Sequence, residues 1–122
     1  MHLDSQAPVI TAQSTILVVD DDSDIRSLTR TFLEHEGYRV HTSGDADRAS
    51  KIFRSAPHID LLITDYSMPQ RSGMDLALEI KSLQPALPIL IISGIFLDPA
   101  QLAQLQTQGW NFLAKPFTLP QL

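Results

Sequence analysis

The chain contains no cysteine, which excludes a disulfide framework, a thiol nucleophile and a cysteine zinc site. It also lacks an excess of basic residues, because nine lysines and arginines stand against fourteen aspartates and glutamates, a formal net charge of −5. An acidic surface repels the phosphate backbone of DNA and RNA. We therefore expect no direct binding of nucleic acid by this chain.

Long hydrophobic runs are absent as well. The longest, from Pro88 to Ile92, is followed by Ser93 and Gly94 and falls far short of the ~20 residues that a membrane-spanning helix needs. The first residues, MHLDSQAPVITAQ, lack the basic segment and the apolar stretch of a signal peptide. These absences predict a cytoplasmic protein with no membrane association.

With 122 residues, of which 43% are hydrophobic, the chain is long enough to bury the core of one domain. Residues 1–14 mix small and polar types without periodicity, and we interpret them as a flexible tail. The folded domain is expected to span residues 15–122.

Short apolar segments alternate with amphipathic ones along that domain, a pattern typical of strands alternating with helices. Strands are expected at five segments: 16–19, 38–42, 59–64, 87–92 and 111–114. Helices are expected over 23–36, between Asp45 and Pro57, from Gly73 to Pro85, and from Asp98, with Thr118 capping a last helix that barely begins. The spacing of apolar residues predicts which residues of two helices face the core. In the first helix they are Ile25, Leu28, Phe32 and Leu33, and in the third helix they are Leu76, Ala77, Ile80 and Leu83.

Strands and helices in alternation predict an α/β fold, a doubly wound parallel sheet with right-handed crossovers. In such sheets ligands bind beyond the carboxyl ends of the strands. Polar residues follow the expected strands at these ends: Asp20, Asp21 and Asp22, then Asp65, Ser93 and Lys115. Clustered carboxylates repel one another unless a cation lies among them, and hard oxygen ligands suit Mg²⁺. The lysine and the serine hydroxyl could hold a phosphoryl group.

Four segments in order resemble the receiver domain of two-component response regulators and hybrid histidine kinases. They are ILVVDDDSDIR at 16–26, LLITDYSMP at 61–69, ISG at 92–94 and KPF at 115–117. The resemblance implies a flavodoxin-like sheet of five parallel strands in the order 2-1-3-4-5. Receiver domains end in a full helix, so the last helix is expected to be truncated or missing here.

The same resemblance implies a Mg²⁺ site. Asp21 and Asp65 would bind the ion directly, Asp20 through water or the outer shell, and Ser67 through its backbone carbonyl. Many relatives have asparagine where Ser67 stands, but a carbonyl can bind metal whatever the side chain is. Asp20 to Asp22 taken alone could also be an acidic cap of the first helix, and we expect that role for Asp22.

The resemblance further implies that Asp65 accepts a phosphoryl group from a phosphohistidine of a histidine kinase or histidine phosphotransfer protein. Ser93 and Lys115 would contact phosphoryl oxygens, and Phe112 would be the switch aromatic that follows the Ser93 hydroxyl. Such a domain is not an enzyme but a switch that assists its own phosphorylation. The face of the fifth strand and the last helix would be open to self-association or to an output domain.

Two alternatives are weighed against this function. A pseudo-receiver would keep the fold and act by protein contacts without phosphate, but the complete set of acidic residues, serine and lysine argues against it. A phosphatase of the aspartyl-phosphate type would place a second acid two residues after its nucleophile, and that position is Ser67.

Overall fold

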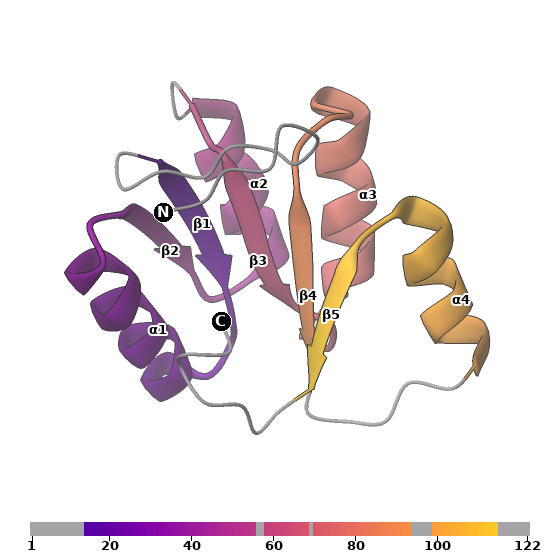
Figure 1. Ribbon diagram of the computed structural model, residues 1–122, viewed down its shortest axis with the longest axis horizontal. Helices are drawn as coiled ribbons and strands as arrows, with labels where there is room; N and C mark the ends of the chain where they lie inside the picture. Colours follow the sequence, from indigo (N-terminus) through magenta and orange to yellow (C-terminus); the bar gives the residue numbers. More distant parts are fainter. Residues whose placement is uncertain (1–13, 56–57, 69, 94–98, 115–122) are drawn as a thin grey trace, which may run out of the picture.

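The computed structural model describes residues 14–55, 58–68, 70–93 and 99–114, and for 111–114 it describes the backbone alone. Strands and helices alternate along these residues as the sequence predicts (Figure 1). The strands are β1 (Thr15–Val19), β2 (Arg39–Ser43), β3 (Leu61–Asp65), β4 (Ile89–Ser93) and β5 (Asn111–Ala114). The helices are α1 (Ser23–His35), α2 (Ala46–Ser55), α3 (Gly73–Leu83) and α4 (Pro99–Gln108).

The strands form one parallel sheet in the order β2-β1-β3-β4-β5, which confirms the predicted doubly wound topology. Val19 pairs with Thr64, and Asp65 pairs with Ile92. Because the register is nearly level, β1, β3 and β4 end at the same edge of the sheet. Residues just beyond these strands are therefore brought together.

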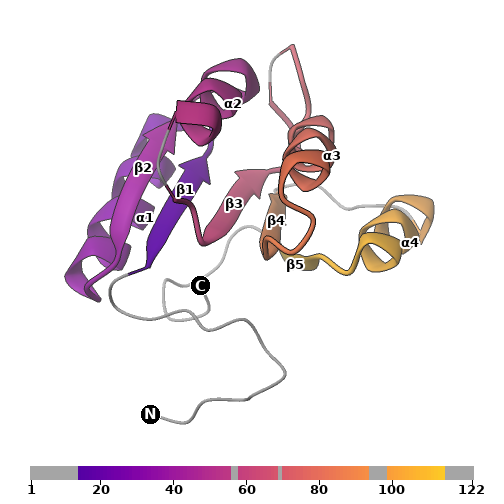
Figure 2. The same cartoon turned by 90° about the horizontal axis from the view of Figure 1, so that it is seen from above.

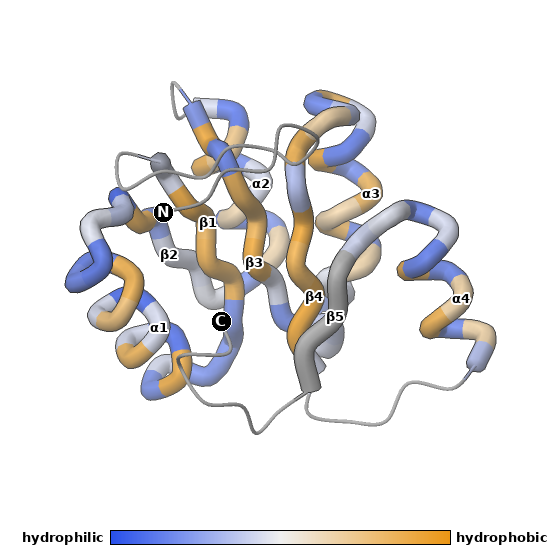
Figure 3. Tube along the Cα trace, viewed as in Figure 1, coloured by the Kyte–Doolittle hydropathy of each residue, from blue (hydrophilic) through white to orange (hydrophobic). Residues whose placement is uncertain are grey.

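Helices cover both faces of the sheet. Residues of α2, α3 and α4 pack with one side of the strands in the larger core cluster, while Leu33 of α1 packs with the other side in a smaller cluster. Figure 2 shows α2 and α3 together on one side of the sheet. In Figure 3 the central strands β1, β3 and β4 are mostly hydrophobic, as burial from both sides requires.

Helix α1 begins at Ser23 as predicted and ends at His35, one residue before the predicted end, but one inward residue was predicted wrongly. The Asp22 carboxylate accepts hydrogen bonds from the backbone N–H of Asp24 and Ile25, at 2.9 and 3.2 Å, which confirms the expected cap. Gly37 follows the helix with φ 98°, a conformation that favours glycine. Leu28 is 60% exposed, whereas Thr29 is buried. The inward face is centred between Thr29 and Leu33, and Leu28 lies more than a quarter turn away from it.

Helix α3 has the predicted inward residues Leu76, Ala77 and Ile80, all fully buried, but Leu83 is exposed. Leu83 is the last residue of α3, and the chain then turns so that Leu87 enters the core. Strand β4 begins at Ile89 rather than Leu87, since Leu87 still donates to the carbonyl of Gln84 in that turn. Strand β3 likewise begins at Leu61 rather than residue 59.

Several expectations fall on residues outside the described ranges. They concern the tail at 1–13, Pro57, Asp98, Thr118 and the last helix. Ser14, the last residue of the expected tail, is buried, and its carbonyl accepts a hydrogen bond from the N–H of Arg39. Among the helices that the structure describes, none combines the length and hydropathy required to cross a membrane.

Candidate functional site

Three carboxylates gather at the carboxyl edge of the sheet. Asp20 and Asp21 follow β1, Asp65 ends β3, and one oxygen from each lies within 4.8 Å of the others. The strand register explains this, because β1 and β3 are neighbours that end at the same level. The structure thus brings together the three aspartates that the sequence singled out.

The burial of these carboxylates bears on what they can bind. Asp20 is 3% and Asp65 is 6% exposed, whereas Asp21 is open to solvent. Keeping several carboxylates ionised at close range in a partly buried site is costly unless a cation offsets their charge. Hard oxygen donors with an open, hydrated side suit Mg²⁺, so the residues present fit such an ion.

Asp20 is held in place by its own backbone and by the start of α1. One of its carboxylate oxygens accepts from the N–H of Asp22 at 2.9 Å, and its N–H donates to the carbonyl of Ser43 at 3.1 Å. The guanidinium of Arg26 donates to the Asp20 carbonyl at 2.7 Å. The role of Arg26 was not predicted, since its position one turn into α1 is the only signal of it in the sequence.

The Asp65 backbone is fixed by a close contact with the start of α3. Tyr66 N–H continues the β3–β4 ladder by donating to the carbonyl of Ile92 at 2.6 Å, and Gly73 N–H donates to the carbonyl of Tyr66 at 2.8 Å. A Cβ on Gly73 would lie 1.8 Å from the Asp65 carbonyl oxygen. Only glycine lets α3 begin this close to the strand end.

The other predicted site residues are placed less completely. Ser93 ends β4 on the same edge as Asp65 and is 1% exposed, while Ser67 lies exposed in the loop after β3. Phe112 lies in β5 opposite Ile91, but its side chain is outside the described part of the chain. Lys115 is outside it altogether, so the roles of these four residues stay predictions.

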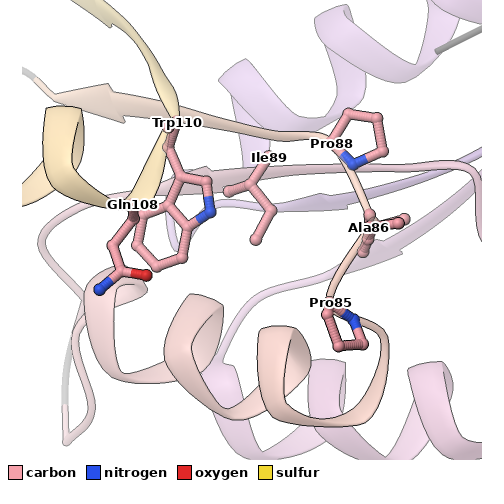
Figure 4. A pocket seen from close by; sticks show the side chains of 8 residues that line it. Pro85, Ala86, Pro88, Ile89, Gln108 and Trp110 are labelled. Atoms are coloured by element: carbon pink, nitrogen blue, oxygen red, sulfur yellow. The ribbon is translucent and has the colours of Figure 1, made fainter.

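A separate cavity lies at the opposite edge of the sheet. It has a volume of about 280 Å³ and is lined by Pro85, Ala86, Leu87, Pro88, Ile89, Gln108, Gly109 and Trp110. Figure 4 shows Trp110 and Gln108 on one side of it and the two prolines on the other. None of its lining residues is acidic, so the cavity does not share the chemistry of the aspartate cluster.

The sequence of this α/β domain matches a known protein family. Residues 16–122 match the family model of the response regulator receiver domain. The chain belongs to this family. The match covers all three aspartates and every other predicted site residue of the receiver domain.

Relatives and solved structures agree with that assignment. Response regulator SaeR of Staphylococcus epidermidis is 31% identical over 103 residues, which are 84% of this chain and 44% of that protein. The DNA-binding transcriptional regulator NtrC of Rhizobium meliloti is 33% identical over 111 residues, 89% of this chain and 22% of that protein. The receiver domain thus spans less than half the length of these curated relatives.

A solved response regulator receiver protein from Pseudomonas putida superimposes on this receiver domain with a TM-score of 0.83 at 30% identity. The similarity covers 92% of this chain and 93% of that one. The fold, and not only the sequence motifs, is therefore that of a receiver domain.

Proposed function

We propose that this receiver domain, spanning residues 15–122, accepts a phosphoryl group on Asp65 and changes conformation in response. The donor would be a phosphohistidine of a histidine kinase or histidine phosphotransfer protein in the cytoplasm. The observation that carries the proposal is the convergence of Asp20, Asp21 and Asp65 within 4.8 Å in a chain of this family. Asp65 is the acceptor because it is the last residue of β3 and so lies at the carboxyl edge of the sheet.

In the proposed reaction a carboxylate oxygen of Asp65 attacks phosphorus in line as the bond from phosphorus to the imidazole nitrogen breaks. The electron pair of that bond leaves with the imidazole. Asp20, Asp21, Asp65 and the Ser67 carbonyl would hold Mg²⁺, which when bound offsets the negative charge of the phosphoryl oxygens. The buried ends of β1 and β3 hold the aspartates in position, and this positioning contributes most of the catalysis.

Three residues outside the acidic cluster would respond to the phosphorylation of Asp65. The Ser93 hydroxyl would donate to one phosphoryl oxygen and Lys115 would pair with another, and Phe112 would move with Ser93. Phosphorylation would thereby draw the ends of β4 and β5 toward Asp65. Because the protein is itself the acceptor, we class it as a switch rather than an enzyme.

Half-buried apolar residues on the α1 side of the sheet support a docking role for that side. Leu61 and Leu90 are half-buried there, while their neighbours Leu62 and Ile91 on the opposite face are completely buried. An apolar surface on β3 and β4 suits contact with a second copy or an output domain. We propose that this surface, and not the aspartate edge, passes the signal on.

Labelling with a small-molecule phosphodonor tests the proposal. After incubation with acetyl phosphate and MgCl₂, borohydride reduction and peptide mapping should find the modification at Asp65 alone. Asp65→Asn should remain unlabelled. Asp21→Asn should lose both Mg²⁺ binding and labelling, whereas Asp22→Asn, which changes only the helix cap, should keep both. Label on Asp20 or Asp21 in the wild type, or full labelling of Asp21→Asn, would contradict the assignment.

A further inference from the structure

The loop between Asp65 and α3 contains a backbone conformation that its sequence does not favour. Gln70 has φ 72°, the only positive φ among the non-glycine residues that the structure describes. A side chain with a Cβ crowds the backbone in this region. Such a conformation persists only where the surroundings impose it. The residues on either side of Gln70 should therefore anchor the loop.

Two anchors flank Gln70. On one side Met68 packs against the larger core cluster. On the other, Arg71 donates from one nitrogen to Asp47 of α2 at 3.1 Å and from the other to Glu79 of α3 at 2.7 Å. The planar fork of the guanidinium makes both contacts at once, each through a different nitrogen. The loop is thus tied to two helices through one side chain.

Glu79 is itself held on its second oxygen. Arg54 donates to that oxygen at 2.8 Å, and the Ser50 hydroxyl hydrogen-bonds to it. Bonds from Arg54, then Ser50 and Arg71, lower the pKa of Glu79 to about 2. Glu79 therefore stays ionised at neutral pH, and Arg71 has a fixed partner. A charge network of this kind resists screening better than an isolated surface pair.

We infer that Arg71 is a positioning residue, which holds the β3–α3 loop in its strained form so that the Ser67 carbonyl can take part in the proposed cation site. The inference rests on the proposed function, since Ser67 matters only if the aspartates bind Mg²⁺. Arg71 lies four residues after Ser67 and two before Gly73, whose N–H closes the loop onto the Tyr66 carbonyl. Freeing Arg71 would loosen this closure.

Arg54 provides a matched control. It contacts the same carboxylate of Glu79 as Arg71 does, at nearly the same distance, but belongs to α2 and not to the loop. Arg71→Gln and Arg54→Gln therefore each remove one charge and one ion pair to Glu79. Only Arg71→Gln releases the loop.

The experiment measures Mg²⁺ affinity by amide chemical shifts at constant ionic strength, and amide hydrogen exchange in the metal-free protein. Arg71→Gln should weaken Mg²⁺ binding about three- to fivefold and speed exchange of the Gly73 amide by a similar factor. Arg54→Gln should leave both near the wild-type values. Arg71→Lys, which keeps the charge but loses the planar fork with its two donor nitrogens, should fall between. Urea unfolding of each variant separates loop effects from global stability.

The outcomes distinguish the inference from the proposed function. If the wild type binds Mg²⁺ and Arg71→Gln binds it equally well, the inference is overturned. If Arg54→Gln matches Arg71→Gln in both measurements, the network acts only on stability and the inference is again overturned. If the wild type binds no Mg²⁺, the proposed function fails, while Gly73 exchange still shows whether Arg71 anchors the loop.

Discussion

At the scale of the residue, three consecutive aspartates have three different environments. Asp20 is buried and held by the backbone of Asp22, Asp21 is exposed beside Asp65, and Asp22 caps α1. The chain passes here from strand through loop to helix within three residues, so each carboxylate points in a new direction. Identical side chains thus acquire separate roles from backbone direction alone.

Gly73 and Gly109 give a matched pair for a test at this scale. Gly73→Ala should destabilise the fold by about 3 kcal/mol, because the new Cβ would overlap the Asp65 carbonyl oxygen at 1.8 Å. Gly109 has φ +75°, but a Cβ there would lie in open space. Gly109→Ala should therefore lower the free energy of unfolding by only about 1 kcal/mol. Urea unfolding measures both. Equal losses in the two variants would show that the contact with Asp65 is not tight.

At the scale of the element, α2 and α3 are joined by charges as well as by apolar packing. Arg71 and Arg54 both contact Glu79, and Arg71 also reaches Asp47. Hydrogen bonds to Glu79 and Asp47 in turn raise the pKa of Arg71. The network lies beside the loop that follows Asp65, so the packing of these helices and the geometry of the aspartate edge are linked.

The lowered pKa of Glu79 predicts an acid-sensitive contact between these helices. The pKa falls from 4.5 to about 2 on folding, so the unfolded chain takes up a proton first as pH drops. Stability from Glu79 is therefore complete above pH ~5 and is lost progressively toward pH ~2. Glu79→Gln should be about 1–2 kcal/mol less stable at pH 7 and lose less stability on acidification.

Unfolding by urea between pH 2.5 and 7 checks this prediction. Glu34→Gln serves as the control, since it breaks an exposed pair with Arg30 on α1 and should cost no more than about 0.5 kcal/mol. A pH dependence of Glu79→Gln as steep as that of the wild type would rule out Glu79 as a source of the acid sensitivity.

At the scale of the whole molecule, the larger core cluster joins distant segments. It includes Leu17 of β1, Ala49 of α2, Ile80 of α3 and Leu105 of α4, together with Trp110. A continuous core of this kind should unfold cooperatively. The aspartate edge and the cavity at the opposite edge are parts of one unit.

Trp110 allows this cooperativity to be measured. It is the only tryptophan in the chain and is 8% exposed, so its emission should shift to the red when the core opens. The urea transitions followed by Trp110 fluorescence and by far-ultraviolet circular dichroism should coincide. A fluorescence midpoint well below the dichroism midpoint would show that α4 and β5 open before the rest.

Much of the fold and of the candidate site follows from the sequence by itself. The apolar strands, the cap at Asp22 and the turn at Gly37 depend on neighbouring residues, because hydrogen bonds and dihedral preferences act over a few positions. Alternation of strand and helix then predicts the parallel sheet. The rule that ligands bind at strand ends led to Asp20, Asp21 and Asp65.

Which residues meet across the fold depends on how the elements pack together. The burial of Thr29 in place of Leu28, and the exposure of Leu83, depend on where each helix axis lies against the sheet. The contacts of Arg71 with α2 and α3 join residues far apart in the chain, and no local pattern signals them. Local preferences specify each element, but distances between elements are set by packing of the whole core.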